Sequence, residues 1–281
     1  MRSFLFVIPA PYQVRGKLQP ESRETLVNKI YFIGAGPGDP ELLTLKAKKI
    51  LEKSDIVIYA GSLINKEILK SAKKEAFLYD SSTMDLDEIF KIYEEAKRTG
   101  KTVARIHSGD LSIYSALQEQ LDWCEREGID SEVIPGISSF QAAAATLKQE
   151  LTLPGVSQTL ILTRISGRTE VPEEENLGDL ARAKATMAIF LSVQEIEKVV
   201  DQLKNGYGEE TPVAVVEKAS WPEERKIIGT LGTIAKKVKE SGIKRQALIV
   251  VGDVLRKAYQ KSKLYEADFE HGFRKKKGRP G

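Results

Sequence analysis

At 281 residues, the chain is long enough to form two ordinary domains or one large α/β unit. Its content of 41% hydrophobic and 30% charged residues is typical of a soluble globular enzyme and excludes an intrinsically disordered chain. The formal net charge of +3 is concentrated in residues 270–281, so the rest of the chain is close to neutral, which argues against a protein dedicated to nucleic-acid binding.

Few residues of the chain could bind a metal or form a disulfide. The single cysteine, Cys124, excludes an intramolecular disulfide and a multi-cysteine metal site, and it suits a reducing compartment. The two histidines, His107 and His271, argue against a histidine zinc site. No apolar run approaches the roughly 18 residues of a membrane-spanning helix, and the apolar run at residues 4–8 is shorter than the core of a signal peptide. We therefore expect a cytoplasmic protein with no metal and no membrane partner.

Residues 1–28 show neither hydrophobic periodicity nor a glycine-rich turn, and they contain Pro9, Pro11 and Pro20. We expect this segment to lie outside the working fold, either as a disordered extension or as an upstream extension of the reading frame with the natural start near Val27. A chain that begins there is expected to keep its melting temperature and its activity.

From residue 29 to residue 150, short β-rich runs alternate with amphipathic helical stretches. The predicted strands are residues 29–33, 56–59, 102–107 and 131–134. The predicted helices are residues 41–53, 65–73, 85–98, 113–127 and 138–148. Strands that alternate with helices of this length predict a mostly parallel sheet with helices on its faces.

A second α/β set follows a break at residues 151–155, where proline and glycine stop both helix and strand. Its predicted strands are residues 158–164, 186–192, 212–217, 225–230 and 246–251, and its predicted helices are residues 194–205 and 232–240. The short loop 218–224 favours an antiparallel pair and therefore a mixed sheet. We predict an α/β fold of two α/β domains, residues 29–150 and 155–256, with a ligand cleft between them and a tail at 257–281.

The sharpest local motif is Gly-Ala-Gly-Pro-Gly-Asp-Pro at residues 34–40, between the first strand and a helix. Its glycines permit positive φ angles and close backbone approach. A dinucleotide fingerprint would have glycine where Asp39 stands, and a Walker loop would end in Gly-Lys-Ser/Thr. Pro37 and Pro40 also remove N–H groups that could bind phosphate. The motif therefore predicts a ligand loop of another kind, with a tight turn that binds nothing as the alternative.

Two further motifs follow predicted parallel strands. Residues 106–114 place Ser-Gly-Asp directly after a strand, with Tyr114 about one helical turn further on. Residues 132–139 again join a strand end to a helix start, where Ser138 is either an N-cap or a ligand contact. Because the carboxyl ends of parallel strands meet at one edge of a sheet, all three motifs are expected to converge there, where open α/β sheets bind ligands.

These motifs resemble the signatures of the tetrapyrrole (corrin/porphyrin) methylase family. Stretches at 59–63, 158–169, 218–222 and 262–274 are similar to its precorrin-4 branch, so the resemblance covers roughly residues 29–274. One departure is Leu111, where the family often has proline after Gly-Asp.

The resemblance implies S-adenosylmethionine-dependent methyl transfer to carbon 11 of (cobalt-)precorrin-4 in cobalamin biosynthesis, with S-adenosylhomocysteine as a product. It also implies a homodimer and a trough between two α/β domains that holds the cofactor. Carried over position by position, the cofactor contacts are Pro37, Ser108, Gly109, Asp110, Ile113, Ser138, Ser139, Leu191 and Ala219.

The implied chemistry needs no metal, cysteine or Ser–His–Asp set, because the methyl group to be displaced is already activated. A base could still remove a proton from the macrocycle, and the candidates, none preferred, are Asp39, His107, Asp110 and Tyr114. Because the tetrapyrrole bears several carboxylates, Arg164 and Arg168 are candidate substrate contacts, with a solvated surface position as the alternative.

Three rival functions stay open at this point. Uroporphyrinogen or another precorrin carbon could be the methyl acceptor, which product mass and NMR would distinguish. An RNA-modifying or RNA-binding protein with a basic tail would show salt-dependent RNA binding. A relative that binds the ligand without reaction would show no cofactor turnover.

Overall fold

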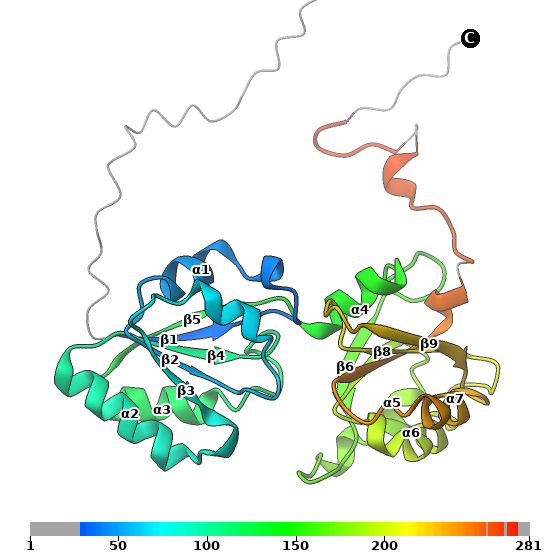
Figure 1. Ribbon diagram of the computed structural model, residues 1–281. Helices are drawn as coiled ribbons and strands as arrows, with labels where there is room; N and C mark the ends of the chain where they lie inside the picture. The colour runs from blue at the N-terminus through cyan, green and yellow to red at the C-terminus, as the bar shows by residue number, and fades with distance from the viewer. Residues whose placement is uncertain (1–28, 257, 267–268, 275–281) are drawn as a thin grey trace, which may run out of the picture.

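The computed structural model describes residues 29–256, 258–266 and 269–274 (Figure 1). The expectation for residues 1–28 lies outside the described residues. In the described part of the chain, no helix is both long enough and apolar enough to cross a membrane.

The first half of the chain forms a five-stranded parallel sheet, as the alternating pattern predicts. The strand order is β3-β2-β4-β1-β5. The strands are β1 (Lys29–Gly34), β2 (Ile56–Tyr59), β3 (Phe77–Asp80), β4 (Val103–His107) and β5 (Asp130–Ile134). Because β1 pairs with both β4 and β5, the ends of these three strands lie side by side.

Helices cover both faces of this sheet. The helix α1 (Leu45–Leu51) packs on one face through a cluster that includes Ile33 and Ile106. The helices α2 (Leu86–Thr99) and α3 (Gln118–Arg126) pack on the other face. Alternate residues of β1 and β4 enter one cluster or the other, as expected for strands buried on both faces.

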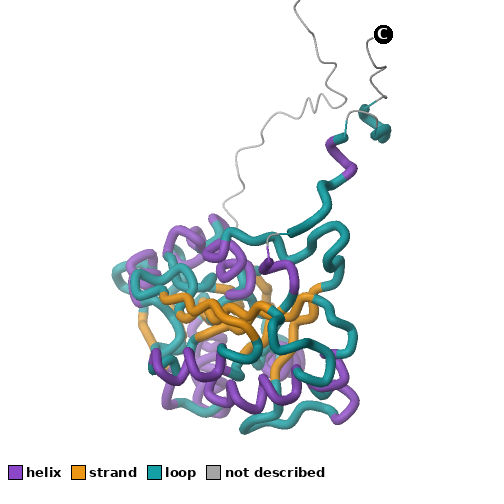
Figure 2. The backbone as a smooth tube through the Cα atoms, turned by 90° about the vertical axis from the view of Figure 1, so that its right-hand side faces the viewer, coloured by secondary structure: helices purple, strands orange, loops and turns teal. Residues whose placement is uncertain are grey.

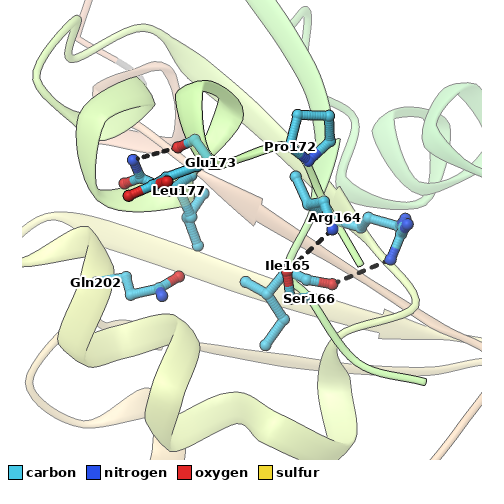
Figure 3. Close-up of a pocket in the computed structure, with 9 residues that line it drawn as sticks. Arg164, Ile165, Ser166, Pro172, Glu173, Leu177 and Gln202 are labelled. Atoms are coloured by element: carbon cyan, nitrogen blue, oxygen red, sulfur yellow. Dashed lines mark hydrogen bonds between the residues drawn. The ribbon is translucent and has the colours of Figure 1, made fainter. Parts of the chain in front are cut away.

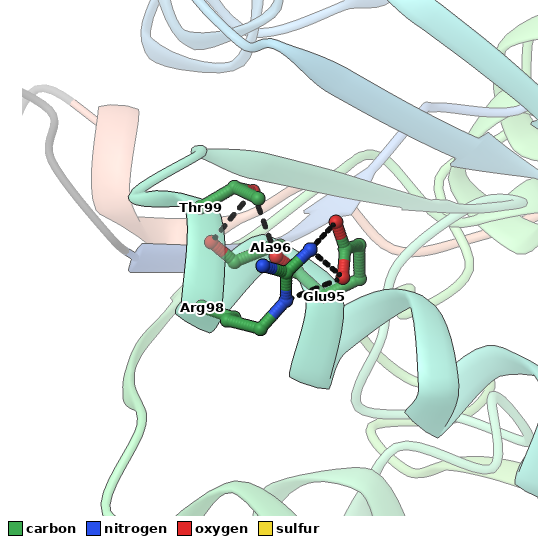
Figure 4. A network of polar contacts seen from close by, with 4 residues as sticks. All are labelled: Glu95, Ala96, Arg98 and Thr99. Carbon is green, nitrogen blue, oxygen red and sulfur yellow. Dashed lines mark hydrogen bonds and ion pairs between the residues drawn. The ribbon is translucent and has the colours of Figure 1, made fainter.

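The helix α2 shows why the local sequence specifies a helix. Asp85 and Glu88 form a capping box at its N-terminus, and Gly100 ends it in a left-handed conformation with φ 67°. In the last turn, the Arg98 guanidinium pairs with the Glu95 carboxylate and the Thr99 hydroxyl donates to the Glu95 carbonyl at 2.7 Å (Figure 4). This ion pair is exposed, so we expect it to contribute less than about 1 kcal/mol to stability.

The second half forms a mixed five-stranded sheet of order β6-β7-β10-β8-β9. Only β6 and β7 run parallel, and the β8–β9 pair is antiparallel, as the short loop predicts. The strands are β6 (Leu160–Arg164), β7 (Thr186–Phe190), β8 (Pro212–Glu217), β9 (Arg225–Thr230) and β10 (Ala247–Val251).

This sheet is also covered on both faces, and Figure 2 shows strands between layers of helix. The helices α5 (Leu177–Ala181), α6 (Ile196–Leu203) and α7 (Ile234–Ser241) pack on one face. The helix α4 (Ser139–Leu147) packs on the other through Ala142 and Ala143. Helix α4 therefore packs on the second sheet although it precedes residue 150 in the sequence. The domain boundaries, at residues 150 and 155, stay a prediction.

Several elements differ from the sequence-based prediction. Strand β3 and helix α5 were not predicted, and residues 66–71 form a 3-10 helix rather than an α-helix. Helix α3 begins five residues later than predicted because Tyr114 and Ala116 adopt positive φ angles of 55° and 51°. The 3-10 helices are η1 (Pro40–Leu42), η2 (Lys66–Ser71), η3 (Ser81–Thr83), η4 (Glu173–Glu175), η5 (Val193–Glu195), η6 (Asp253–Arg256) and η7 (Lys263–Tyr265).

Candidate functional site

The loops that follow β1 and β4 are joined by backbone hydrogen bonds. The Ala35 N–H donates to the His107 carbonyl at 2.8 Å. Gly36 and Gly109 exchange two bonds, with N···O distances of 3.1 and 2.8 Å. The glycine-rich motif and the Ser-Gly-Asp motif therefore meet directly, as expected for neighbouring parallel strands.

The third motif meets the first two at glycines that leave no room for a side chain. A Cβ atom on Gly136 would lie 2.2 Å from the Gly109 carbonyl oxygen and 2.7 Å from the Gly34 carbonyl carbon. A Cβ atom on Gly34 would lie 2.5 Å from the Gly136 nitrogen. All of these neighbours are backbone atoms, so the three strand ends approach so closely that only glycine fits at positions 34 and 136.

The Asp110 carboxylate ties two of these loops together. One oxygen accepts a hydrogen bond from the Gly136 N–H at 2.9 Å, and the other accepts from the Ser112 N–H at 2.9 Å and from the Ser112 hydroxyl. Burial acts to raise the pKa of Asp110, but the hydrogen bonds from Ser112 and Gly136 outweigh it and hold that pKa below its usual value. The site therefore contains an ionised carboxylate at neutral pH.

Four of the other residues expected at the cofactor site, Ser108, Gly109, Ser138 and Ser139, lie on the segments that follow β4 and β5. Ser108 is exposed and Gly109, with φ 69°, is buried. Ser138 occupies the N-cap position of α4, and its N–H donates to Gln141 Oε1 at 2.8 Å. The structure thus supports the capping interpretation of Ser138 and leaves the neighbouring Ser139 half-buried.

A loop of the second half closes over the glycine-rich motif. The Trp221 indole Nε1 donates to the Pro37 carbonyl at 2.7 Å, and the Asp39 N–H donates to Ser220 Oγ at 3.0 Å. The Trp221 ring lies so close to Gly38 that a Cβ atom there would be 2.0 Å from the indole. We call this contact between residues 37–39 and residues 220–221 the latch, and it joins the two halves of the chain.

Replacing Trp221 by phenylalanine is expected to weaken the latch while keeping an aromatic ring against Gly38. The Pro37 carbonyl loses its donor, so we expect a destabilisation of about 1 kcal/mol, the net value of one hydrogen bond. Thermal melting and isothermal titration with S-adenosylhomocysteine measure the effect, and we expect a lower melting temperature and a several-fold weaker affinity. A variant with the melting temperature and the affinity of the unmodified protein would show that the Trp221–Pro37 hydrogen bond contributes to neither stability nor cofactor binding.

One aromatic residue of the first half faces two residues of the second half. The Tyr114 ring lies 5.5 Å from the Phe190 ring, centroid to centroid, and the Arg164 guanidinium carbon lies 5.9 Å from the Tyr114 ring centroid. Phe190 ends β7, and the next residue, Leu191, has φ 53° and is 76% exposed. Non-glycine residues with positive φ, such as Tyr114 and Leu191, are uncommon and cluster at functional sites.

His107 is not available as a base in this structure. Its side chain is buried beside Phe32, and burial, helped by nearby Arg105, lowers its pKa to about 3. A hydrogen bond with the Ser115 backbone acts the other way, and Nε2 has no partner among the described residues. The imidazole is therefore neutral at pH 7 and supports the segment that carries Tyr114.

The guanidinium of Arg164 forms hydrogen bonds with backbone carbonyls of the loop that follows it. It donates to the Thr169 carbonyl at 2.9 Å and to the Glu170 carbonyl at 2.7 Å. Beside it lies a pocket of about 270 Å³, with Gln202 on the side opposite Arg164 (Figure 3). Arg168 is exposed in the same loop and forms no ion pair within the described residues. The structure thus brings Arg164, but not Arg168, to Tyr114.

Three residues near the converging loops, Arg105, Ser220 and Trp221, were not predicted as site residues from the sequence. Trp221 and Ser220 belong to the Lys-Ala-Ser-Trp-Pro stretch, from which only Ala219 was taken as a candidate. Arg105 lies within a strand whose other residues are Val103, Ala104, Ile106 and His107. A charged residue in the middle of a buried strand is a signal that could have identified it.

Comparisons with known proteins agree with one another. Residues 29–235 match the family model described as Tetrapyrrole (Corrin/Porphyrin) Methylases. The chain is 56% identical over 249 residues to the cobalt-precorrin-4 C(11)-methyltransferase of Methanocaldococcus jannaschii, covering 88% of this chain and 96% of that protein. It is similar to the X-ray structure of a cobalamin-biosynthetic cobalt precorrin-4 methyltransferase, with a TM-score of 0.80, 42% identity and coverage of 85% and 99%. It is also similar to a uroporphyrin-III C-methyltransferase of Thermus thermophilus complexed with S-adenosylhomocysteine, with a TM-score of 0.70, 28% identity and coverage of 82% and 100%.

Proposed function

The chain belongs to the tetrapyrrole (corrin/porphyrin) methylase family, and we propose from this that it transfers a methyl group from S-adenosylmethionine to carbon 11 of (cobalt-)precorrin-4 in cobalamin biosynthesis. The observation that carries the assignment is the identity to the Methanocaldococcus jannaschii enzyme over nearly the whole of both chains. The convergence of three glycine-bearing strand ends on one carboxylate supports it.

The residues at these strand ends fit an adenosyl sulfonium ligand. Small residues and bare backbone at Ser108, Gly109 and Ser139 leave space for a ligand beside the Asp110 carboxylate, which favours a nearby cation. Carbonyl oxygens can also accept weak C–H hydrogen bonds from a polarised methyl group. We propose that the contacts are Pro37, Ser108, Gly109, Asp110, Ile113, Ser138, Ser139, Leu191 and Ala219. When bound, S-adenosylmethionine supplies a methyl group that its positively charged sulfur has already activated.

Three of the four candidate bases, His107, Asp110 and Tyr114, have pKa values poorly matched to proton abstraction at neutral pH. A general base works best when its pKa lies near the working pH. Burial lowers the pKa of His107 to about 3 and raises the pKa of the Tyr114 phenol, while hydrogen bonds outweigh burial and lower the pKa of Asp110. We therefore propose that these three residues hold the site in shape, and that the chain contributes mainly by orienting the reactants and excluding water.

Replacing Arg168 by leucine is expected to raise the Michaelis constant for the tetrapyrrole and to leave the affinity for S-adenosylhomocysteine unchanged. An exposed guanidinium with no ion pair in the described part of the chain is free to bind a substrate carboxylate. Replacing Arg164 by leucine should also release the loop at residues 165–170, because the Thr169 and Glu170 carbonyls lose their donor. Unchanged steady-state kinetics in both variants would show that neither arginine binds the substrate and that both are solvated surface residues.

We also propose that the protein functions as a homodimer. The edge strand β3 exposes Phe77 and Leu78, which are 54% and 49% exposed, and an apolar edge strand is a ready surface for association. Light scattering should give twice the chain mass of 31.2 kDa, and the mass of a monomer would contradict the proposal.

The proposed function is tested by incubation with methyl-labelled S-adenosylmethionine and either precorrin-4 or its cobalt complex. We expect the product to gain the mass of one labelled methyl group. Transfer of two methyl groups to uroporphyrinogen, with none to precorrin-4, would assign the chain to another member reaction of the family.

A further inference from the structure

Arg105 is a buried arginine whose hydrogen-bond partners among the described residues are neutral. It lies in the middle of β4, and its residue surface is only 8% exposed. Its Nη1 donates to Ser81 Oγ at 2.8 Å, and its Nε lies 3.4 Å from Gln120 Oε1. The same Gln120 oxygen also accepts a hydrogen bond from the Tyr93 hydroxyl at 2.9 Å. The Arg105 guanidinium therefore shares one acceptor, Gln120 Oε1, with the Tyr93 hydroxyl, and neither of its acceptors is a carboxylate.

Within the part of the chain that the structure describes, no acidic residue compensates this charge from a greater distance. Burial lowers the pKa of Arg105, and the phenol of Tyr93 is the only group that acts in the other direction. Asp80 precedes Ser81, but its carboxylate accepts hydrogen bonds from the Gly61 and Ser82 N–H groups instead. A buried cation without an anion is costly, and proteins usually pair such charges.

The uncompensated charge reaches the edge of the sheet where the proposed ligands bind. Ser81 directly follows β3, so the Arg105 guanidinium lies at the level of the strand ends. Its second terminal nitrogen, Nη2, has no partner among the described residues and is not sealed from solvent. His107, two residues further along β4, lies on the same face, beside Phe32, and its Nε2 has no partner among the described residues.

Arg105 is thus better placed to hold a carboxylate than the arginines chosen from the sequence. Arg164 already donates to two backbone carbonyls, and Arg168 is exposed, where water competes for its hydrogen bonds. A guanidinium in a poorly hydrated position forms stronger bonds to a carboxylate than a solvated one does.

We infer that Arg105 binds one side-chain carboxylate of the tetrapyrrole substrate and so helps to determine its specificity. The inference rests on the proposed function, because it takes the tetrapyrrole as the ligand. In this arrangement the carboxylate supplies the anion that the buried guanidinium lacks.

The test uses the full chain loaded with S-adenosylhomocysteine and two stable probes, a porphyrin polycarboxylate and its methyl ester. Equilibrium binding is measured for the unmodified protein, for Arg105→Met, for Arg105→Lys and for the exposed control Arg126→Met. We expect the unmodified protein and the control to prefer the polycarboxylate, and Arg105→Met to bind it about tenfold or more weakly, the loss typical of a bond to a charged group. Arg105→Lys should lose less, and the affinity of each variant for S-adenosylhomocysteine should stay within about twofold of the unmodified value.

Thermal melting separates a binding role from a structural one. If Arg105 serves a ligand, Arg105→Met removes an uncompensated buried charge and should melt at the same temperature as the unmodified protein or higher. The inference fails if Arg105→Met binds the polycarboxylate as well as the unmodified protein, or if it melts lower and loses both ligands together. Failure of the unmodified protein to bind the polycarboxylate would instead count against the proposed function.

Discussion

Replacing Gly136 by alanine is expected to lower the melting temperature by about 6–12 °C, which corresponds to a destabilisation of about 3 kcal/mol for overpacking in a chain of this size. The new Cβ atom would lie 2.2 Å from the Gly109 carbonyl oxygen and 2.7 Å from the Gly34 carbonyl oxygen. Backbone atoms cannot rotate away, so the ends of β1, β4 and β5 must separate. Because the same three loops surround Asp110, we also expect the affinity for S-adenosylhomocysteine to fall by more than about tenfold.

Gly208 provides a matched control for this substitution. It lies in an exposed turn, no atom comes within 4 Å of the Cβ position, and its φ is outside the left-handed region. Gly208→Ala should therefore melt within about 2 °C of the unmodified protein, on the scale of an unstrained glycine substitution. Equal behaviour of the two variants, measured by calorimetry and titration, would mean that the strand ends have room that the structure does not show.

Replacing Asp110 by alanine is expected to lower the stability at neutral pH by about 2 kcal/mol, because charge-assisted hydrogen bonds to Ser112 and Gly136 are lost. We also expect the affinity for S-adenosylmethionine or its demethylated product to fall about tenfold or more, since the loop at Gly136 is released and the carboxylate is gone. Isothermal titration and urea unfolding measure the two effects. If Asp110→Ala keeps the full affinity for S-adenosylmethionine or its demethylated product, Asp110 is not part of the cofactor site.

The stabilisation of the fold by the Asp110 carboxylate depends on pH, and the direction of its pKa shift sets the sign of that dependence. The pKa of Asp110 is lower in the folded protein than in the unfolded chain, so its stabilising effect is complete above the unfolded pKa, near 3.9. The effect is lost as the pH falls through the folded value. The stability gap between the unmodified protein and Asp110→Ala should therefore close below about pH 4, whereas the exposed control Asp201→Ala should show little gap at any pH. A gap that widens in acid would contradict the assigned direction of the pKa shift.

Much of the fold follows from hydrophobic periodicity and turn residues. The runs at 29–33, 56–59 and 102–107 are buried on both faces, which is why they read as strands of a covered parallel sheet. Parallel strands also bring their carboxyl ends together, so the meeting of Gly34, Asp110 and Gly136 could be expected without coordinates.

Features set by contacts between distant residues could not be predicted in this way. Residues 113–117 belong to the helix predicted over 113–127, yet Tyr114 and Ala116 take positive φ angles in the segment packed over His107. The Trp221–Pro37 bond joins residues 184 positions apart, which no local pattern encodes. Strand β3 was missed because all four of its residues are exposed and its place in the sheet comes from pairing with β2.

The position of the transferred methyl group distinguishes methylation at carbon 11 from the other methylations that this family could perform. The chain is incubated with S-adenosylmethionine carrying a ¹³C-labelled methyl group and with cobalt-precorrin-4 or precorrin-4, and the product is analysed by NMR. We predict one new labelled methyl signal that correlates with carbon 11 of the macrocycle and is absent when the protein is omitted. A labelled methyl group at any other ring carbon, or no enzyme-dependent transfer to either substrate, would contradict the account.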